Sequence, residues 1–315
     1  MSLASKDLKI AVKAVRFASE ATKFVNSPSA IIKSDSSPVT IADYASQIVI
    51  MSILQENGNA DFIAEEDDKG LSNDTLEKVE DVVKKVLPNF KPNSVKEVLR
   101  RNVCTSNSQF WTIDPIDGTK GYLRGDQYAI CLAKIFDGKV QVAAMCCPNL
   151  DGGIIFFAER DRGAYQMKID EEDISAAERI YCHPRETEAS VLCESYESPH
   201  SSHSDSGNLR KDLNISKDSI RMDSQCKYGL VANGKANIFF RRATKENYYE
   251  KIWDHAAGAL IVQEAGGIVS HLNGDPLVFT NGPLLNNGSG ILATSDDSLH
   301  SKIVQYFKEK QVNKA

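Results

Sequence analysis

The sequence predicts a layered protein of class α+β or α/β, in which helices cover sheets, and two observations support this prediction. The first half of the chain combines helical patterns with paired strands, which predicts an antiparallel sheet. The second half alternates strands with helices. Because no segment has the composition of a linker, we treat residues 1–175 and 176–315 as subdomains of one unit, the second being the smaller.

Two helices are predicted near the start of the chain. Apolar residues recur at helical spacing from about Ser5 to Phe24, which predicts an amphipathic helix. Thr40-Ile-Ala-Asp43 has the form of a capping box. A second helix is therefore predicted to begin there and to continue to Gln55.

The remainder of the first half is predicted to consist mainly of strands. The polar stretch 69–108 interrupts them, with one helix expected at 76–86. Asp137-Gly138 is a strong hairpin signal between two apolar runs. The predicted strands of this half are residues 61–64, 128–136, 140–147, 153–158 and 164–169.

The second half begins with a polar stretch, residues 170–219, which is predicted as loops around two short strands. A helix is predicted from Ile252 to Glu264, where Gly266-Gly267 ends it. The other predicted elements are strands at 180–182, 191–193, 236–240, 268–271 and 291–294, and helices at 227–234 and 299–310.

The composition excludes several classes of protein. The chain has 315 residues and a net charge of −6, which argues against binding of polymeric nucleic acid. Its seven cysteines lack the spacing of a zinc site, so we expect reduced, mostly buried thiols and a cytoplasmic protein. No stretch is long enough to span a bilayer. The basic residues of Met1–Val25 would suit a transit peptide, but Asp7 and Glu20 favour an ordinary amphipathic helix.

The most informative segment is Asp114-Pro-Ile-Asp117-Gly-Thr119, which follows a short apolar run. Carboxylates this close together repel each other unless cations neutralise them. Oxygen-rich sites of this kind suit Mg²⁺, which commonly shares its ligands with a phosphate of the substrate. The Gly-Thr turn adds backbone N–H groups and a hydroxyl. The segment therefore predicts metal-assisted cleavage of a phosphate ester.

Other acids stand at the ends of predicted elements. Glu65 ends a strand, and Asp254 opens the helix that contains Gly258. Singly, such acids are more often exposed charges: Asp254 would suit a helix N-terminus, and Asp35 would suit a turn. We interpret Glu66 and the two acids after it as solvated neighbours of Glu65. The prediction of a site therefore depends on the combination of acids.

Three separated motifs together resemble the lithium-sensitive, Mg²⁺-dependent phosphatase superfamily of inositol monophosphatases and fructose-1,6-bisphosphatases. They are Ala64-Glu65-Glu66, Asp114-Pro-Ile-Asp117-Gly-Thr119 and Trp253-Asp254-His-Ala-Ala-Gly258. Within this superfamily the chain resembles the 3′(2′),5′-bisphosphate nucleotidases over about residues 8–305. The segments that carry this closer resemblance are 36–43, 117–129, 147–150, 200–203, 223–228 and 250–258. Residues 69–108 fit least well, and Ala64 replaces the usual Gly.

The resemblance implies a layered αβαβα sandwich and a role for each matching position. Two Mg²⁺ ions, and a weaker third one, would be held by Glu65, Asp114, the carbonyl of Ile116, Asp117 and Asp254. The resemblance implies that Asp35 and the Thr119 hydroxyl orient and deprotonate the attacking water. The N–H groups near Gly118 and Thr119 would bind the phosphoryl oxygens.

The resemblance also implies substrate-binding residues in the second half. Those assigned to a second phosphate or to the nucleotide are His200, Ser224, Lys227, Arg241 and Asp254. Simpler interpretations stay open: the two basic residues could be surface charges, and Arg242 could take the place of its neighbour. Lys120 and Arg124 could attract the substrate or offset nearby acids.

The implied activity is Mg²⁺-dependent hydrolysis of the 3′-phosphate of adenosine 3′,5′-bisphosphate, and of its sulfated relative, with inhibition by Li⁺. The alternative is an inositol polyphosphate 1-phosphatase or an inositol monophosphatase. A silent nucleotide or Mg²⁺ sensor is disfavoured because every acid of the motifs is present. We expect a monomer whose partner is a small bisphosphate nucleotide, not a membrane.

Overall fold

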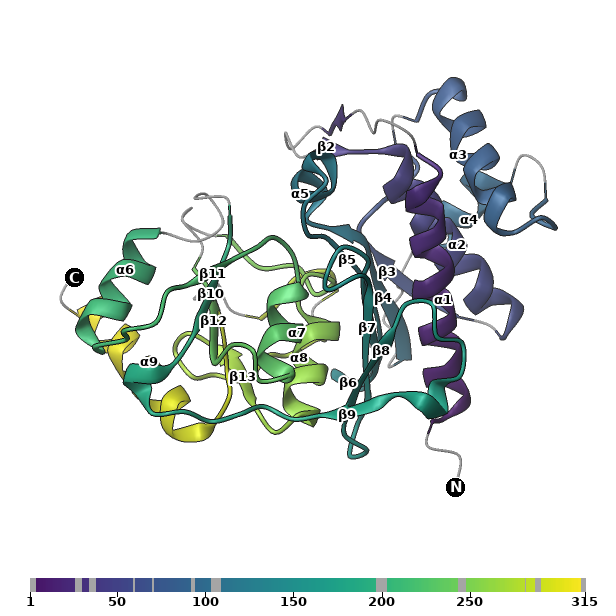
Figure 1. Cartoon of the computed structure of the whole chain (residues 1–315). Helices are drawn as coiled ribbons and strands as arrows, with labels where there is room; N and C mark the ends of the chain where they lie inside the picture. The colour runs from purple at the N-terminus through teal and green to yellow at the C-terminus, as the bar shows by residue number, and fades with distance from the viewer. Residues whose placement is uncertain are drawn as a thin grey trace.

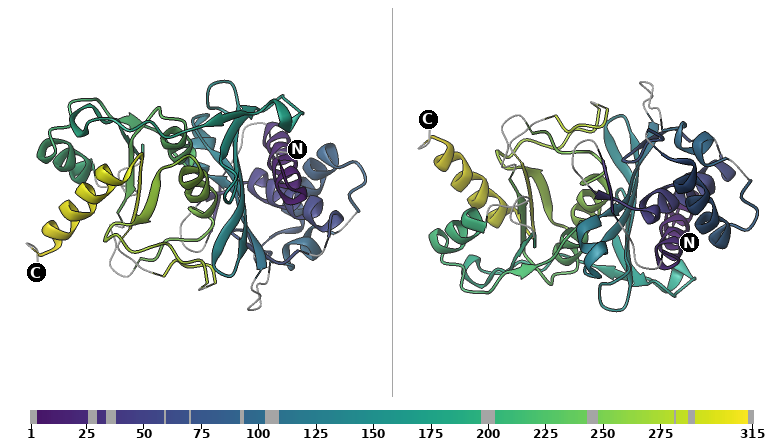
Figure 2. Two further views of the ribbon diagram at one scale, coloured as in Figure 1. Left: turned by 90° about the horizontal axis from the view of Figure 1, so that it is seen from below. Right: turned by 90° about the horizontal axis from the view of Figure 1, so that it is seen from above.

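The computed structural model describes residues 4–25, 30–33, 38–58, 60–69, 71–91, 94–102, 109–196, 203–242, 248–280, 282–286 and 290–312. The chain is arranged in five layers, which alternate helices and sheets as the resemblance implied (Figure 1). Helices α1 and α9 lie at opposite ends of this stack (Figure 2). None of the helices in the described residues combines the length and the apolar composition needed to cross a bilayer.

A seven-stranded sheet forms the second layer, in the order β3-β4-β5-β6-β7-β8-β9. Neighbouring strands in this sheet are antiparallel, as predicted for this half, except for β3 and β4, which are parallel. Strand β9 belongs to this sheet, although it lies beyond the division that the sequence suggested at 175/176. The strands are β3 (Phe62–Ala64), β4 (Gln109–Asp117), β5 (Ala129–Phe136), β6 (Lys139–Cys147), β7 (Ile154–Glu159), β8 (Ala164–Lys168) and β9 (Glu178–Ile180).

Helices cover the outer face of this sheet. Ser5 caps α1, and the capping box predicted at Thr40 and Asp43 is confirmed at the start of α2. The short helix α4 was not predicted, because five residues carry too little periodicity to be recognised. The elements of this region are α1 (Lys6–Lys23), α2 (Ile41–Glu56), α3 (Asn73–Val86), α4 (Val95–Leu99) and the antiparallel pair β1 (Ile31–Ile32) and β2 (Pro38–Val39).

The third layer consists of α7 (Cys226–Ala232) and α8 (Ala256–Glu264), which pack between the two sheets (Figure 1). Helix α8 begins four residues later than predicted. The N–H groups of His255 and Ala256 both donate to the Ile252 carbonyl, at 3.3 and 2.9 Å, so the chain turns before the helix starts. This turn carries Asp254.

The fourth layer is a five-stranded sheet in the order β11-β10-β12-β14-β13. Helix α6 (His203–Asp212) and helix α9 (Asp297–Val312) cover its far side. The prediction of loops around α6 was wrong, because this polar helix owes its place to the burial of Leu209. The strands are β10 (Leu192–Glu194), β11 (Ile220–Arg221), β12 (Ile238–Arg241), β13 (Ile268–His271) and β14 (Ile291–Thr294).

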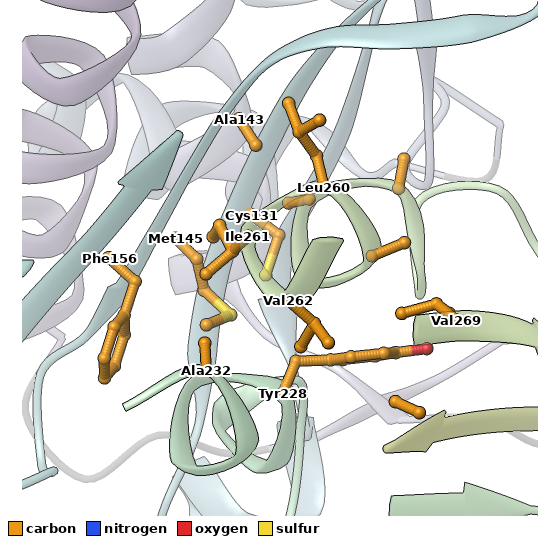
Figure 3. Close-up of a cluster of buried hydrophobic side chains, with 14 of the residues drawn as sticks. Cys131, Ala143, Met145, Phe156, Tyr228, Ala232, Leu260, Ile261, Val262 and Val269 are labelled. Atoms are coloured by element: carbon orange, nitrogen blue, oxygen red, sulfur yellow. The ribbon is translucent and has the colours of Figure 1, made fainter. Parts of the chain in front are cut away.

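The central core joins the first sheet to the third layer (Figure 3). Met145 and Phe156 from the sheet belong to one cluster of buried side chains with Tyr228 of α7 and Val262 of α8. Gly258 lets α8 approach this ring, since a Cβ there would lie 2.3 Å from Tyr228 Cδ2. The prediction of reduced, buried thiols is confirmed for the six cysteines in the described residues: Cys131, Cys146, Cys147, Cys182, Cys193 and Cys226.

Candidate active site

The acidic motif occupies the end of strand β4 and the turn that follows it. Asp114 is buried within the strand, and the register of β4 against β5 shifts between Asp114 and Asp117. Gly118 then adopts a φ of 87°, which favours glycine, and leads into the short helix α5 (Thr119–Arg124). The irregular strand end therefore brings both carboxylates and the Gly-Thr turn to one edge of the sheet.

Glu65 reaches the same edge from the parallel neighbour of β4. The Glu65 N–H donates to the Ile113 carbonyl at 3.1 Å, which places Glu65 next to Asp114 across the ladder. The Lys33 ammonium donates to Glu65 Oε1 at 3.1 Å and to Glu66 Oε1 at 2.8 Å. A pair of neighbouring acids thus shares one cation from the segment that follows β1.

Glu66 is not a solvated neighbour, and that interpretation was wrong. Its side chain is only 2% exposed, and the side chain of Gln47 in α2 binds its backbone on both sides. Burial, together with repulsion from Glu65, raises the pKa of Glu66 to about 8. Glu66 is buried because α2 packs against this turn. The local run of acidic residues gives no indication of this burial.

Asp254 reaches the site from the second half, and Gln225 connects it to the first. The Gln225 N–H donates to Asp117 Oδ2 at 2.6 Å. Its side-chain amide donates to the Trp253 carbonyl at 2.8 Å and accepts from the Gly258 N–H at 3.1 Å. Gln225 was not predicted as a site residue, because its role depends on residues 28 to 108 positions away.

The electrostatics of these carboxylates are those of a cation site. Burial and repulsion from Glu65, Asp117 and Asp254 raise the pKa of Asp114 well above its usual range. Burial likewise raises the pKa of Asp117 to about 6 and that of Asp254 to about 7. Asp114 Oδ1 is buried and lacks a hydrogen-bond partner among the residues that the structure describes. An all-oxygen set of this kind fits divalent cations such as Mg²⁺.

Thr119 faces Asp43, a carboxylate outside the predicted set of site residues. Its hydroxyl lies within donor distance of Asp43 Oδ1, at 3.3 Å, and of the Ile116 carbonyl, at 3.2 Å. Burial raises the pKa of Asp43 to about 7, although Thr40 donates two hydrogen bonds of 2.7 Å to it. The expected partner, Asp35, lies outside the described residues. Asp43 was recognised only as part of the capping box.

The basic residues expected to bind a second phosphate lie beside these acids. Lys227 is buried, donates to the Met222 carbonyl at 3.2 Å, and its charge, like that of Arg241, lowers the pKa of Asp117. Arg241 NH1 lies 3.5 Å from Asp254 Oδ2. Lys227 and Arg241 are therefore not ordinary surface charges.

The other expected substrate-binding residues are placed as follows. Ser224 is buried and has a φ of 68°, which is uncommon for a residue other than glycine. It packs against the metal motif, since a Cβ on Gly118 would lie 3.1 Å from Ser224 Cβ. Arg242 forms an ion pair with Asp205 of α6 at 3.3 Å. His200 lies outside the described residues.

The roles left open for Lys120 and Arg124 are partly resolved by the structure. Arg124 forms ion pairs with Asp126, at 2.9 Å, and with Asp223, and its guanidinium lies over the ring of Tyr196. Arg124 therefore offsets neighbouring acids and ties α5 to the segment before Ser224. Lys120 is exposed.

A cavity of about 470 Å³ opens beside Glu65. Its wall includes Trp253 and Pro283 from the second half and Arg100 from the first. Glu65 is thus the candidate ligand that lines this hollow between the two halves.

Comparisons with known proteins reveal relatives of this chain. A sequence profile described as the Inositol monophosphatase family matches residues 3–311. A 3′(2′),5′-bisphosphate nucleotidase of Schizosaccharomyces pombe is 38% identical over 289 residues, which cover 84% of this chain and 82% of that protein. One from Oryza sativa is 36% identical over 302 residues, covering 85% of this chain and 83% of its own length.

Solved structures share the fold at lower identity. An IMPase of Thermotoga maritima aligns with a TM-score of 0.66 and 19% identity, covering 96% of this chain and 95% of its own. The extragenic suppressor protein suhB of Bartonella henselae gives a TM-score of 0.65 and 21% identity, covering 95% of both chains. These structures support the fold.

Proposed function

The chain belongs to the inositol monophosphatase family, and from this premise we propose that it hydrolyses the 3′-phosphate of adenosine 3′,5′-bisphosphate to give AMP and phosphate. Its sulfated relative would be a second substrate. Several relatives that are 32–38% identical carry the name 3′(2′),5′-bisphosphate nucleotidase. The observation that carries the proposal is the pair Lys227 and Arg241 beside the acids, since a monophosphate needs no second anion site.

Enzymes of this family depend on Mg²⁺. The residues that would hold the cations are Glu65, Asp114, Asp117, Asp254 and the carbonyl of Ile116. Bound Mg²⁺ would lower the pKa of a coordinated water and neutralise charge on the phosphoryl group. The orphaned oxygen of Asp114 supports this assignment, and we propose two ions and a weaker third.

The residues of the chain supply the proton transfer and the orientation of the phosphate. We assign to Asp43 the role expected for Asp35, because the described hydrogen bond joins Asp43 to Thr119. As the attacking water loses a proton, the Thr119 hydroxyl relays it to Asp43, whose pKa of about 7 suits a base at neutral pH. The N–H groups at the start of α5, near Gly118, orient the phosphoryl oxygens.

The second phosphate would be bound by Lys227, Arg241 and Ser224. The ammonium and guanidinium groups supply charge and hydrogen bonds to an anion that is not cleaved. His200 is proposed to contact the nucleotide. The buried, free cysteines support a reducing compartment, for which we propose the cytoplasm.

The first experiment measures phosphate release from adenosine 3′,5′-bisphosphate, inositol 1,4-bisphosphate and inositol 1-phosphate, each with Mg²⁺ and with chelator. Fast, Mg²⁺-dependent release from the nucleotide is expected. A preference for inositol 1-phosphate would retain the metal site and contradict the roles of Lys227 and Arg241. A preference for inositol 1,4-bisphosphate would contradict the nucleotide substrate.

Replacing Lys227 tests the second anion site. In Lys227→Met the buried volume is nearly kept and the charge is lost, so turnover of the bisphosphate nucleotide should fall much more than that of inositol 1-phosphate. The surface variant Lys235→Met serves as a control, because Lys235 pairs with Asp151 on an exposed turn. Equal losses on both substrates in Lys227→Met would contradict the proposed site.

A further inference from the structure

Arg241 is in contact with a buried carboxylate, that of Glu250. The Glu250 side chain is 1% exposed, and its Oε2 forms an ion pair with Arg241 Nε at 3.2 Å. The same oxygen lies 3.2 Å from Nε2 of His255, whose side chain is also 1% exposed. Burying an ionised carboxylate costs free energy unless an opposite charge is paired with it. The Arg241 guanidinium supplies that charge for Glu250.

This carboxylate is connected to the central core. Nδ1 of His255 lies 2.8 Å from the hydroxyl of Tyr228, whose ring is fully buried between α8 and the five-stranded sheet (Figure 3). Tyr228, His255 and Glu250 thus form a hydrogen-bonded chain that starts in the rigid core and ends at Arg241. None of these three residues belongs to the sites described above.

Arg241 is held at three different nitrogens. Its Nε contacts Glu250, its NH1 lies 3.5 Å from Asp254 Oδ2, and its NH2 donates to the hydroxyl of Tyr248 at 3.2 Å. A guanidinium carries five N–H groups in a fixed plane, so contacts at three nitrogens determine both its position and its orientation. Without Glu250, Asp254 would be its remaining carboxylate partner among these contacts, and the guanidinium would be drawn toward the metal ligands.

Glu250 also belongs to a group of side chains whose ligand atoms lie close enough together to hold a metal ion. Glu250, Asp254 and His255 each offer one ligand atom, all within 4.8 Å of one another. However, Arg241 already places a positive charge 3.2 Å from Glu250 Oε2, inside this cluster. A cation there would be repelled by that charge, so the cluster is better explained as the anchor of the guanidinium.

We propose that Glu250, supported by His255 and Tyr228, is a positioning residue that orients Arg241 toward the second phosphate and thereby sets the preference for bisphosphate substrates. The inference rests on the proposed function. An arginine already ordered loses less conformational freedom when it binds an anion. Glu250 also keeps the guanidinium from competing with cations for Asp254.

The test compares two substrates that differ only in the second phosphate: adenosine 3′,5′-bisphosphate and adenosine 3′-monophosphate, at saturating Mg²⁺. In Glu250→Gln, kcat/KM for the bisphosphate should fall by about 10- to 100-fold, mainly through KM, as expected for the loss of a charge-assisted contact. The value for the monophosphate should change by less than about 3-fold. Inhibition by AMP should weaken in parallel. Equal losses on both substrates would overturn the inference.

Glu194→Gln is the matched control. Glu194 is likewise buried and accepts from an arginine Nε, that of Arg221, at 2.8 Å in the same sheet. It should change both substrates by the same factor. Tyr228→Phe keeps the buried ring and removes only the hydroxyl, so it should show a smaller loss confined to the bisphosphate, and it tests the inference even if Glu250→Gln does not fold.

The outcome also separates this inference from the proposed function. If the unaltered protein releases phosphate from neither nucleotide, the proposed function fails and the inference fails with it. If it cleaves both nucleotides equally well, a second phosphate site does not operate, and Glu250 has no such role. A selective loss in Glu250→Gln and in Tyr228→Phe supports the inference.

Discussion

Removing divalent cations should make this protein less stable as the pH rises from 5 to 8. Burial raises the pKa of Asp254 from 3.8 to about 7. Below pH 4 this carboxyl is protonated in the folded and the unfolded protein, so it does not affect folding. Between pH 4 and 7 the unfolded chain releases the proton while the folded protein retains it, and folding becomes progressively less favourable.

The size of the effect follows from the shift. Between pH 5 and the folded pKa of about 7, about 2 pH units at about 1.4 kcal/mol each correspond to a loss of about 3 kcal/mol in the free energy of unfolding from Asp254 alone. For a chain of this length, a loss of about 3 kcal/mol lowers the melting temperature by about 5 °C. Asp117 and Asp43, with pKa values raised to about 6 and about 7, act in the same direction.

Mg²⁺ should reverse the effect. At pH 8 the cation meets ionised carboxylates and should restore most of the lost stability, whereas at pH 5 protons compete with it. The assay is thermal unfolding, followed by circular dichroism, of metal-free protein at several values between pH 5 and 8, with and without Mg²⁺. Equal stabilisation by Mg²⁺ at both ends, or metal-free protein that gains stability with pH, would refute the reasoning.

Two variants test whether ionisation of Asp254 causes this pH dependence. Asp254→Asn removes the ionisation, so the metal-free variant should lose much of the pH dependence and be more stable than the unaltered protein at pH 8. Asp151→Asn alters an exposed carboxylate at a turn with a φ of 50°, a conformation that Asn accepts. Its pH dependence should match that of the unaltered protein.

Three further predictions concern single residues. Asp117→Asn should lose most turnover while circular dichroism shows an intact fold, and unchanged turnover would remove Asp117 from the site. Thr119→Val should lower kcat by about 100-fold, because the relay to Asp43 is lost, while the Mg²⁺ concentration for half-maximal rate stays the same. A parallel change in that concentration would instead assign the hydroxyl to the cations. Gly258→Ala should cost about 1–3 kcal/mol in urea unfolding, since its Cβ would lie 2.3 Å from Tyr228, and a stable variant would contradict this packing.

Much of the fold could be predicted from the sequence because its signals are local. The first helix follows from apolar spacing and a serine cap, and the hairpin at Asp137-Gly138 follows from residues that tolerate a positive φ. Helix α6 could not be predicted, because its polar residues give no amphipathic pattern and its place depends on Leu209 being buried elsewhere in the fold.

The candidate site likewise has features that follow from local sequence and features that depend on tertiary packing. The sequence by itself determined which acids stand at strand and turn ends, because motif and spacing are properties of neighbours in the chain. Only the tertiary structure decided that Asp43 meets Thr119, 76 positions away, that Glu66 is buried, and that Glu250 holds Arg241. Such contacts form when separate layers pack against one another. The free energy that favours this packing comes from the whole core, so no local sequence pattern predicts the contacts.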